Sequence, residues 1–140
     1  MKLKKVCVTV MATVLLIGGA TTNLTYAAEL QESGVDYQIV TPFWDEISSI
    51  SPYISADGTT LYPEVYIKAK SSSDPISGTM YLEKYSSGKW ISVTSWSISE
   101  TGDAFLSKSY KGSSGYKYRT KVIVNVDGEN AVATSGTCEI

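Results

Sequence analysis

Residue types that usually carry catalysis are scarce in this chain of 140 residues. It contains no histidine, and its two cysteines are Cys7 and Cys138. Because Cys7 lies in a segment that we expect to be removed on export, the mature chain would hold one thiol and form no internal disulfide. A zinc site of His and Cys, a Ser-His-Asp triad and a Cys-His pair are all excluded by such a set. We therefore predict no catalytic residues, no metal and no other cofactor.

Carboxylates remain as candidates for acid–base chemistry. Asp45 and Glu46 are adjacent, so on a strand their side chains would point to opposite faces. A glycosidase needs two carboxyl groups about 5 to 10 Å apart across a cleft. The other candidates, Glu64, Glu83 and Asp103, are scattered, and a small sandwich domain offers little cleft to hold them. The sequence favours a protein that is not an enzyme.

Two acidic stretches resemble calcium ligands but are typical of turns. They are Asp57-Gly58 and residues 127–130 (DGEN). A calcium loop supplies several regularly spaced oxygens, which neither stretch has. Asp-Gly is the ordinary sequence of a tight hairpin turn, because both residues tolerate positive φ. We predict a turn at each place and no metal site.

Aromatic residues interleaved with charge are the main indication of a binding surface. Tyr81 and Tyr85 lie opposite the apolar Met80/Leu82 side of their segment, so they should point to solvent. A fibronectin-type strand order would place them beside three cations of a later segment. Flat rings beside cations can form a platform for a sugar ring or a partner protein, because Tyr and Arg dominate such contacts. The candidate ligand-binding residues are Tyr81, Tyr85, Lys117, Arg119 and Lys121.

A purely structural interpretation of the same face stays open. Glu83 could pair across strands with Arg119 or Lys121 and merely stabilise a solvated sheet. Four other aromatic residues are expected in the core. They are Trp90, Trp96, Tyr116 and Tyr118.

Turn signals and alternating apolar residues predict an all-β domain over residues 44–140. The connections are too short for the helical crossovers of a parallel sheet. Seven antiparallel strands then favour a two-sheet β-sandwich of immunoglobulin or fibronectin type III character, with a small closed barrel as the alternative. The predicted strands are residues 47–56, 61–70, 77–85, 90–98, 104–110, 116–127 and 131–139.

Three details of these strands carry expectations of their own. Residues 90–98 are apolar at both parities, which indicates either a bulge or an edge position. Tyr116 or Tyr118 could bond its hydroxyl back to the backbone, as in the tyrosine corner of such sandwiches. The first strand contains Pro52 and the last is short of charge, so the last strand is the expected exposed edge for pairing.

The N-terminus has the layout of a secretory signal peptide. Lys2, Lys4 and Lys5 precede an apolar run over residues 6–17, and Thr25-Tyr26-Ala27 places small residues before a cleavage point. The apolar run is shorter than the roughly 20 residues that span a bilayer. We expect a signal peptide at 1–27, a flexible arm at 28–43, and a secreted, extracellular protein. The alternative is an uncleaved N-terminal membrane anchor.

Cleavage would also leave the protein acidic. All three lysines depart with the signal, while the 14 acidic residues remain, so the net charge becomes about −5. An acidic protein gains little from phosphate contacts or from anionic lipids. We expect no nucleic-acid partner and no membrane partner after cleavage.

Several segments together resemble a family of small secreted proteins from Gram-positive, mostly anaerobic bacteria, whose function is uncharacterised. The segments are 80–85 (MYLEKY), 88–97 (GKWISVTSWS), 106–110 (LSKSY) and 115–119 (GYKYR). The resemblance covers residues 44–126. It implies a single β-sandwich with no assigned activity, and it brings no catalytic residues to this chain.

These features favour a secreted, non-enzymatic binding or adhesion module that recognises a glycan or an extracellular protein through an exposed sheet face. Two alternatives stay open: a structural protein that assembles with itself through edge strands, and a secreted toxin or bacteriocin-like protein.

Overall fold

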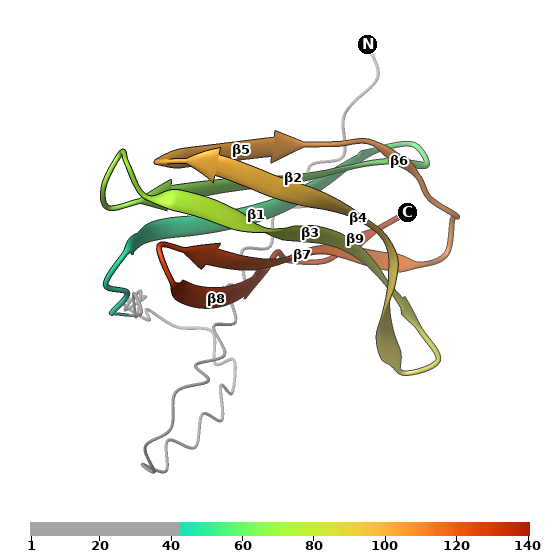
Figure 1. Cartoon of the computed structure of the whole chain (residues 1–140). Helices are drawn as coiled ribbons and strands as arrows, with labels where there is room; N and C mark the ends of the chain where they lie inside the picture. The colour runs from blue at the N-terminus through green and yellow to red at the C-terminus, as the bar shows by residue number, and fades with distance from the viewer. Residues whose placement is uncertain (1–42) are drawn as a thin grey trace, which may run out of the picture.

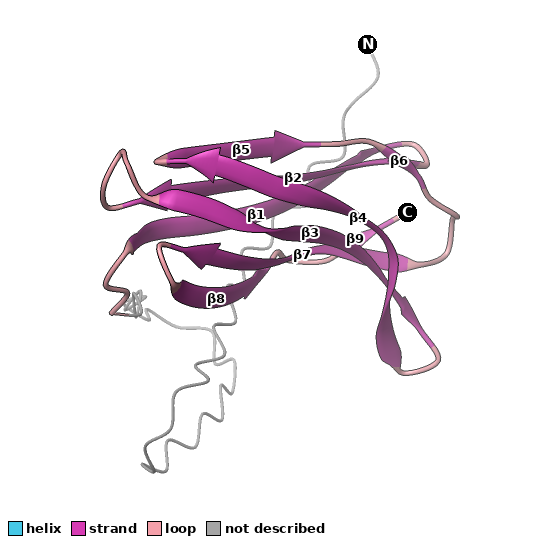
Figure 2. Cartoon of the chain, in the orientation of Figure 1, coloured by secondary structure: helices cyan, strands magenta, loops and turns pink. Residues whose placement is uncertain are grey.

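The computed structural model describes residues 43–140. The predicted signal peptide (1–27) and all of the predicted arm (28–43) except Phe43 lie outside the described residues. The described part contains strands and turns but no helix, and so no helix that could cross a membrane (Figure 1; Figure 2). Its strands are β1 (Ile47–Asp57), β2 (Thr60–Ala69), β3 (Pro75–Ser86), β4 (Lys89–Thr101), β5 (Asp103–Ser107), β6 (Tyr110–Lys111), β7 (Lys117–Val126), β8 (Glu129–Thr134) and β9 (Cys138–Glu139).

The strands lie in two antiparallel layers. One layer has four strands, β1, β2, β5 and β6, and the other has five, β3, β4, β7, β8 and β9. The hydrogen-bonded order is β1-β2-β5-β4-β3-β7-β8, in which only the pair of Thr101 and Asp103 joins the layers. In Figure 1 the chain passes between the layers at this corner, where β4 ends and β5 begins. The prediction of an all-β, two-layer antiparallel fold is confirmed.

Residues 43–140 form nine strands where the sequence predicts seven, because two predicted strands are interrupted. Residues 104–110 divide into β5 and β6, which pair with β2 in one register. Pro63 lies opposite the break. It has no N–H to donate, and its carbonyl oxygen accepts a bond from Lys108 N at 3.0 Å. Residues 131–139 divide in the same way into β8 and β9.

Alternating side chains of the two layers form the core. Every second residue of β2 and of β7 is buried, as the sequence predicts. Ile123 is an apolar residue at an outward position of β7 and is 41% exposed. Burial of these branched side chains is the main stabilising contribution to a fold of this kind. The buried residues of the two strands are Leu61, Pro63, Val65, Ile67, Ala69, Tyr118, Thr120, Val122, Val124 and Val126.

A bulge in β4 explains why apolar residues occur at both parities of this strand. The pairing with β3 shifts between Leu82 and Glu83, which leaves Val93 as the extra residue. Beyond the bulge Trp96 packs against the core, whereas before it Trp90 lies on the outer side of the sheet. β4 also lies at the edge of its layer, so both explanations that the sequence left open apply.

Tyr118 makes the backbone contact that the sequence predicts for one of two tyrosines. Its side chain is buried, and its hydroxyl accepts a bond from Ser113 N (2.9 Å) and donates one to Ser113 O (3.3 Å). Tyr116 is 38% exposed and lies beneath the Lys84 ammonium group, 4.3 Å from the ring centroid. The prediction that Tyr116 belongs to the core is therefore wrong.

Cys138 is completely buried, in a cluster with Leu61 and Tyr118. The structure has Cys138 disulfide-bonded, which differs from the single thiol that we expected. That expectation depended on removal of Cys7 with the signal peptide, and Cys7 lies outside the described residues.

Candidate binding face

The outer side of β4, β3 and β7 carries most of the residues that the sequence nominates for binding. β3 pairs with β4 on one side and with β7 on the other, so the predicted adjacency of the segments around residues 81 and 119 is confirmed. Glu83 lies opposite Arg119, and Tyr81 lies opposite Lys121. We call the following six residues the aromatic–cation face: Tyr81, Glu83, Tyr85, Trp90, Arg119 and Lys121.

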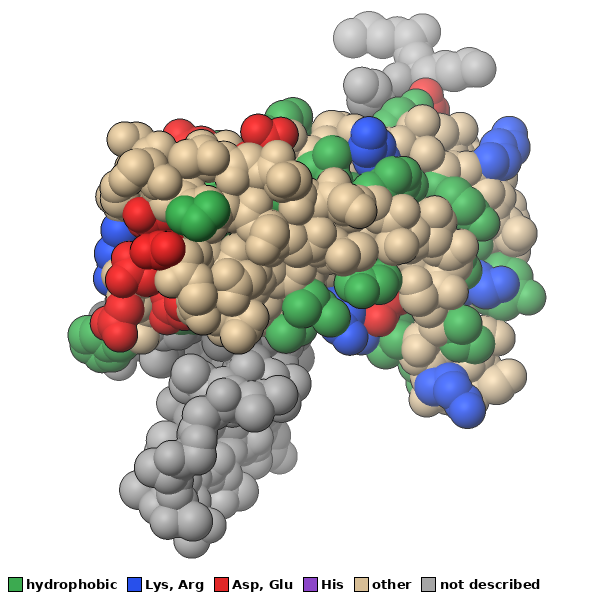
Figure 3. Space-filling model, viewed as in Figure 1, with side chains coloured by type: hydrophobic (Ala, Val, Ile, Leu, Met, Phe, Trp, Pro, Cys, Tyr) green, Lys and Arg blue, Asp and Glu red, His purple; other side chains and the backbone are tan. Residues whose placement is uncertain are grey.

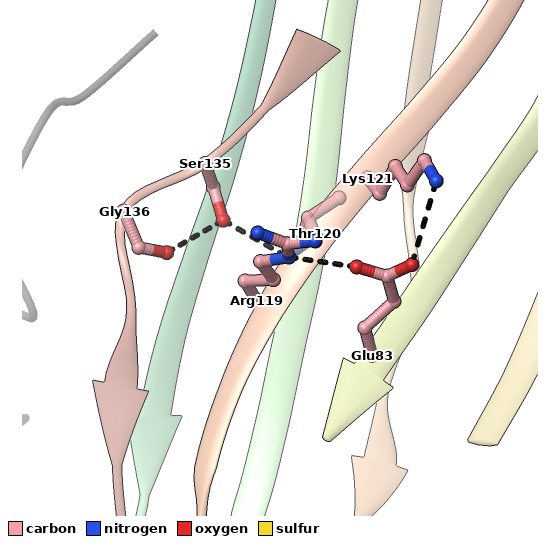
Figure 4. A network of polar contacts seen from close by, with 6 residues as sticks. All are labelled: Glu83, Arg119, Thr120, Lys121, Ser135 and Gly136. Atoms are coloured by element: carbon pink, nitrogen blue, oxygen red, sulfur yellow. Dashed lines mark hydrogen bonds and ion pairs between the residues drawn. The ribbon is translucent and has the colours of Figure 1, made fainter. Parts of the chain in front are cut away.

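Glu83 is the electrostatic centre of this face. Only 9% of its side chain is exposed, and its carboxylate lies between two cations of β7 (Figure 4). Arg119 Nε donates to Oε2 at 2.7 Å, and Lys121 Nζ lies 3.7 Å from Oε1. A carboxylate so far out of water needs such partners, because burial without them is costly. One anion therefore holds two cations in fixed positions.

Two aromatic rings extend this network along the face. The Tyr85 and Trp90 ring centroids are 5.2 Å apart, with an angle of 59° between the ring planes. The Arg119 guanidinium carbon lies 4.3 Å from the Trp90 ring centroid, a distance suited to a cation–π contact. Each ring and cation thus touches the next, from Tyr85 through Trp90 and Arg119 to Glu83. The face is held in place before any ligand arrives.

The predicted binding residues are not all equally placed on this face. Tyr85 is 42% exposed and offers the most open ring, whereas Tyr81 is half-buried. Arg119 and Lys121 are partly exposed and are held by Glu83. Lys117 is exposed but pairs with β9, on the side of β7 away from β3. It therefore lies at the margin of the face.

Sequence reasoning missed Trp90, which we had expected in the core. The signal for it was present: the turn at Ser87-Gly88 places Trp90 directly opposite Tyr85 in the hairpin. The bulge hid this, because it reverses the parity of Trp90 relative to Trp96. Trp96 is half-buried and packs against both core clusters, close to the expectation.

The outer side of the other layer offers a useful comparison. Tyr66 of β2 and Phe105 of β5 are directly opposite each other and are 38% and 65% exposed. Among residues 43–140, no salt bridge like those of Glu83 accompanies this pair. It is an aromatic pair on a sheet surface, without the charged network.

Three carboxylates gather at the end of the sandwich where β1 and β3 begin. Ligand oxygens of Glu46, Asp74 and Asp127 all lie within 4.8 Å of one another. Glu129 lies nearby and accepts backbone bonds from Glu46 N (2.8 Å) and Ile47 N (3.1 Å). The sequence did not indicate this cluster, because its members come from distant segments. Both predicted acidic turns are hairpin turns, with positive φ at Gly58, Asp127 and Gly128.

No family model, curated protein or solved structure matches this chain. The resemblance to secreted proteins of Gram-positive bacteria therefore stays a prediction, and the function has to be argued from the residues themselves.

Proposed function

We propose that this protein is a secreted, non-enzymatic binding module that recognises a glycan or an extracellular protein through the aromatic–cation face. The observation that carries the proposal is the continuous contact of Tyr85, Trp90, Arg119, Glu83 and Lys121 on one exposed side of the sheet. Aromatic and arginine side chains supply most of the energy in protein recognition sites. Export is an expectation from residues 1–27.

The arrangement suits binding because little of it has to become ordered. Immobilising a long side chain at an interface costs about 0.5–1.5 kcal/mol, and Glu83 has already met that cost for Arg119 and Lys121. Arg119 bonds Glu83 through Nε, and its terminal nitrogens carry further N–H groups for a ligand oxygen. The open Tyr85 ring can pack against a sugar ring or an apolar side chain.

We also infer that the sandwich is of the immunoglobulin or fibronectin type III kind. The two antiparallel layers and the Tyr118 hydroxyl bonded to the Ser113 backbone support this assignment. Domains of this type commonly serve as binding modules, but fold alone does not establish function.

A glycan array and an array of purified extracellular proteins test the proposal. We expect binding that Tyr85→Ala and Arg119→Ala each weaken about tenfold or more, as for central residues of an interface. Tyr66→Ala is the matched control, because Tyr66 has similar exposure on the opposite layer and should leave binding unchanged.

Two results would contradict the proposal. Blank arrays at high protein concentration would favour the purely structural interpretation, in which Glu83 and its cations only stabilise the sheet. Binding that depends on Tyr66 rather than Tyr85 would move the site to the other layer.

Self-assembly is a second candidate function, and one observation favours it. The long edge of β4 has almost no strand partner in the described part of the chain. This edge is considered next.

A further inference from the structure

β4 is a long edge strand with one open side. It pairs with β3 along its whole length, from Lys89 opposite Ser86 to Thr101 opposite Pro75. On its other side, Thr101 is the only residue with a strand partner among the described residues, and that partner is Asp103. Within residues 43–140, the backbone N–H and C=O groups on the open side of residues 89–100 therefore have no neighbouring strand.

The composition of this edge does not protect it from pairing. Between Lys89 and Glu100 the sequence is WISVTSWSIS, without a charged residue, proline or glycine. Natural edge strands are usually protected by charge, proline, a bulge or short length. β4 has only the bulge at Val93, and from Thr94 to Thr101 its pairing with β3 is regular.

The edges of β1, β8 and β9 are better protected. β1 carries Pro52 and an irregularity near its start, between Ile47 and Ser49. Its backbone is also tied to the opposite layer, since Thr120 Oγ1 donates to Tyr53 O at 2.8 Å. β8 and β9 have six and two residues. β8 ends the strand order, as expected of the last strand, but β4 offers a longer uncovered edge.

Charge at the two ends of β4 identifies a fitting partner. Lys89, with Lys84 nearby in the same hairpin, lies at its first end, and Glu100, followed by Asp103, lies at its last. In an antiparallel pair of two β4 strands, the basic end of one strand approaches the acidic end of the other. A parallel pair would bring like charges together. The edge is thus complementary to itself in the antiparallel direction.

We propose that two copies of this chain pair through antiparallel β4 strands about a two-fold axis. The pairing extends the β3-β4-β7-β8-β9 layer continuously from one copy into the other. Such an interface is isologous, with the same strand contributed by each copy. It adds main-chain hydrogen bonds to groups that otherwise face water, which is the general mode of strand addition. This inference rests on the edge and its charges, and it does not depend on the proposed ligand.

The pairing would also bring two aromatic–cation faces onto one continuous sheet surface. Trp90 belongs to β4 itself, and Tyr85 lies opposite it on β3. A dimer would therefore present two copies of the face to a surface that repeats its ligand. Two linked sites bind such a surface much more tightly than one.

Sedimentation velocity of the purified protein over a range of concentrations tests the pairing. We expect a reversible monomer–dimer equilibrium. Ser97→Lys places a charge on the exposed outer side of β4, within the strand that would form the interface, and should raise the dimer dissociation constant about tenfold or more. The matched control, Ser51→Lys on the edge strand β1, should leave it unchanged. Circular dichroism and thermal unfolding establish that both variants are folded.

A charge swap tests the antiparallel direction. Lys89→Glu and Glu100→Lys should each raise the dissociation constant several-fold, because each places like charges together, and the double variant should restore it. A monomer at all concentrations would overturn the proposal. So would a dimer indifferent to Ser97→Lys, or one in which the double variant is no better than the single variants. None of these three results would bear on ligand binding by the monomer.

Discussion

Tyr118 shows how one buried hydroxyl can fix a loop that no strand supports. Its two bonds to Ser113 hold the segment between β6 and β7 against the core. Tyr118→Phe should lower the free energy of unfolding by about 1–2 kcal/mol, because the Ser113 N–H loses a partner in a part-buried position. Urea unfolding measures the change.

The control for this variant is Tyr116→Phe, two positions away in the sequence. Tyr116 is 38% exposed, and its hydroxyl makes none of the hydrogen bonds found for the described residues. Loss of the Tyr116 hydroxyl should change the free energy of unfolding by less than about 0.5 kcal/mol. Equal effects of the two substitutions would refute the role assigned to Tyr118.

The coupling energy between Glu83 and Arg119 measures how firmly the network holds the aromatic–cation face. A double-mutant cycle with Glu83→Gln and Arg119→Met should give a coupling energy of about 1–2 kcal/mol. That exceeds the value for an exposed pair because the Glu83 side chain is only 9% exposed, although Arg119 at 23% remains partly screened by water.

Lys68 and Asp103 provide the comparison for that cycle, since they are opposite each other on β2 and β5 and both are exposed. Their coupling should be about 0.2–0.5 kcal/mol. Chemical denaturation of each set of four proteins measures both values. A Glu83–Arg119 coupling no larger than that of the exposed pair would mean that the network does not hold the face in place.

At the scale of strands, the corner between the layers depends on Gly102. Its φ is +76°, and a Cβ atom there would lie 2.7 Å from the Ser72 carbonyl oxygen. Hydrogen bonds also hold the backbone in place, because Gly102 N donates to Asp74 O (2.9 Å) and Gly102 O accepts from Ala69 N (2.8 Å). The chain cannot easily move aside to accept a side chain.

Gly102→Ala should therefore lower the free energy of unfolding by more than about 2 kcal/mol, because strain at positive φ adds to a clash with backbone. Gly88→Ala measures the backbone strain alone, since Gly88 also has positive φ but nothing lies within 4 Å of the added Cβ atom. It should cost about 1 kcal/mol. Thermal or urea unfolding compares the two variants. Equal losses in the free energy of unfolding would contradict a steric role for Ser72.

The strands also show what sequence reasoning can and cannot recover. Alternation located β2 and β7, because branched side chains at every second position have one way to be buried together. It failed at β4, where a single extra residue, Val93, reverses the parity and sends Trp90 outward. Parity alone does not locate a bulge, since either side of the strand could hold the extra residue.

The candidate face was predicted in part for a related reason. The adjacency of β3 and β7 followed from the sandwich topology, so Tyr81, Tyr85, Arg119 and Lys121 were grouped correctly. Lys117 was included because it shares their parity, although its strand pairing is with β9. The break in the ladder at Pro63 could have been anticipated, since proline cannot donate to a strand on either side.

For the whole molecule, the main feature is a separation of charge along the strands. Acidic side chains gather at the end where β3 begins, on the left of Figure 3, and most basic ones toward the other end. This polarity arises from the turns: Asp127 and Glu129 flank one hairpin, whereas Lys84 and Lys89 flank another. It favours antiparallel over parallel association of two copies.

The acidic end should also cost the molecule stability. Glu46, Asp74 and Asp127 have carboxylate oxygens within 4.8 Å of one another, a distance at which like charges repel appreciably. Asp127→Asn removes one charge and leaves an Asn-Gly turn, which suits the positive φ of 45° at this position. The free energy of unfolding should rise by about 0.5–1 kcal/mol at low salt.

Two effects contribute to the expected rise in the free energy of unfolding, namely relief of charge repulsion and a better turn residue, and salt distinguishes them. The Debye length falls from about 10 Å at 0.1 M to about 3 Å at 1 M, so the part due to repulsion should shrink in urea unfolding at high salt, while the part due to the turn persists. Asp57→Asn, in a hairpin at the basic end, should give no electrostatic gain, because its carboxylate is not part of the acidic cluster. A loss of stability in Asp127→Asn would mean that the Asp127 carboxylate stabilises the fold on balance, which contradicts a dominant repulsion among the three carboxylates.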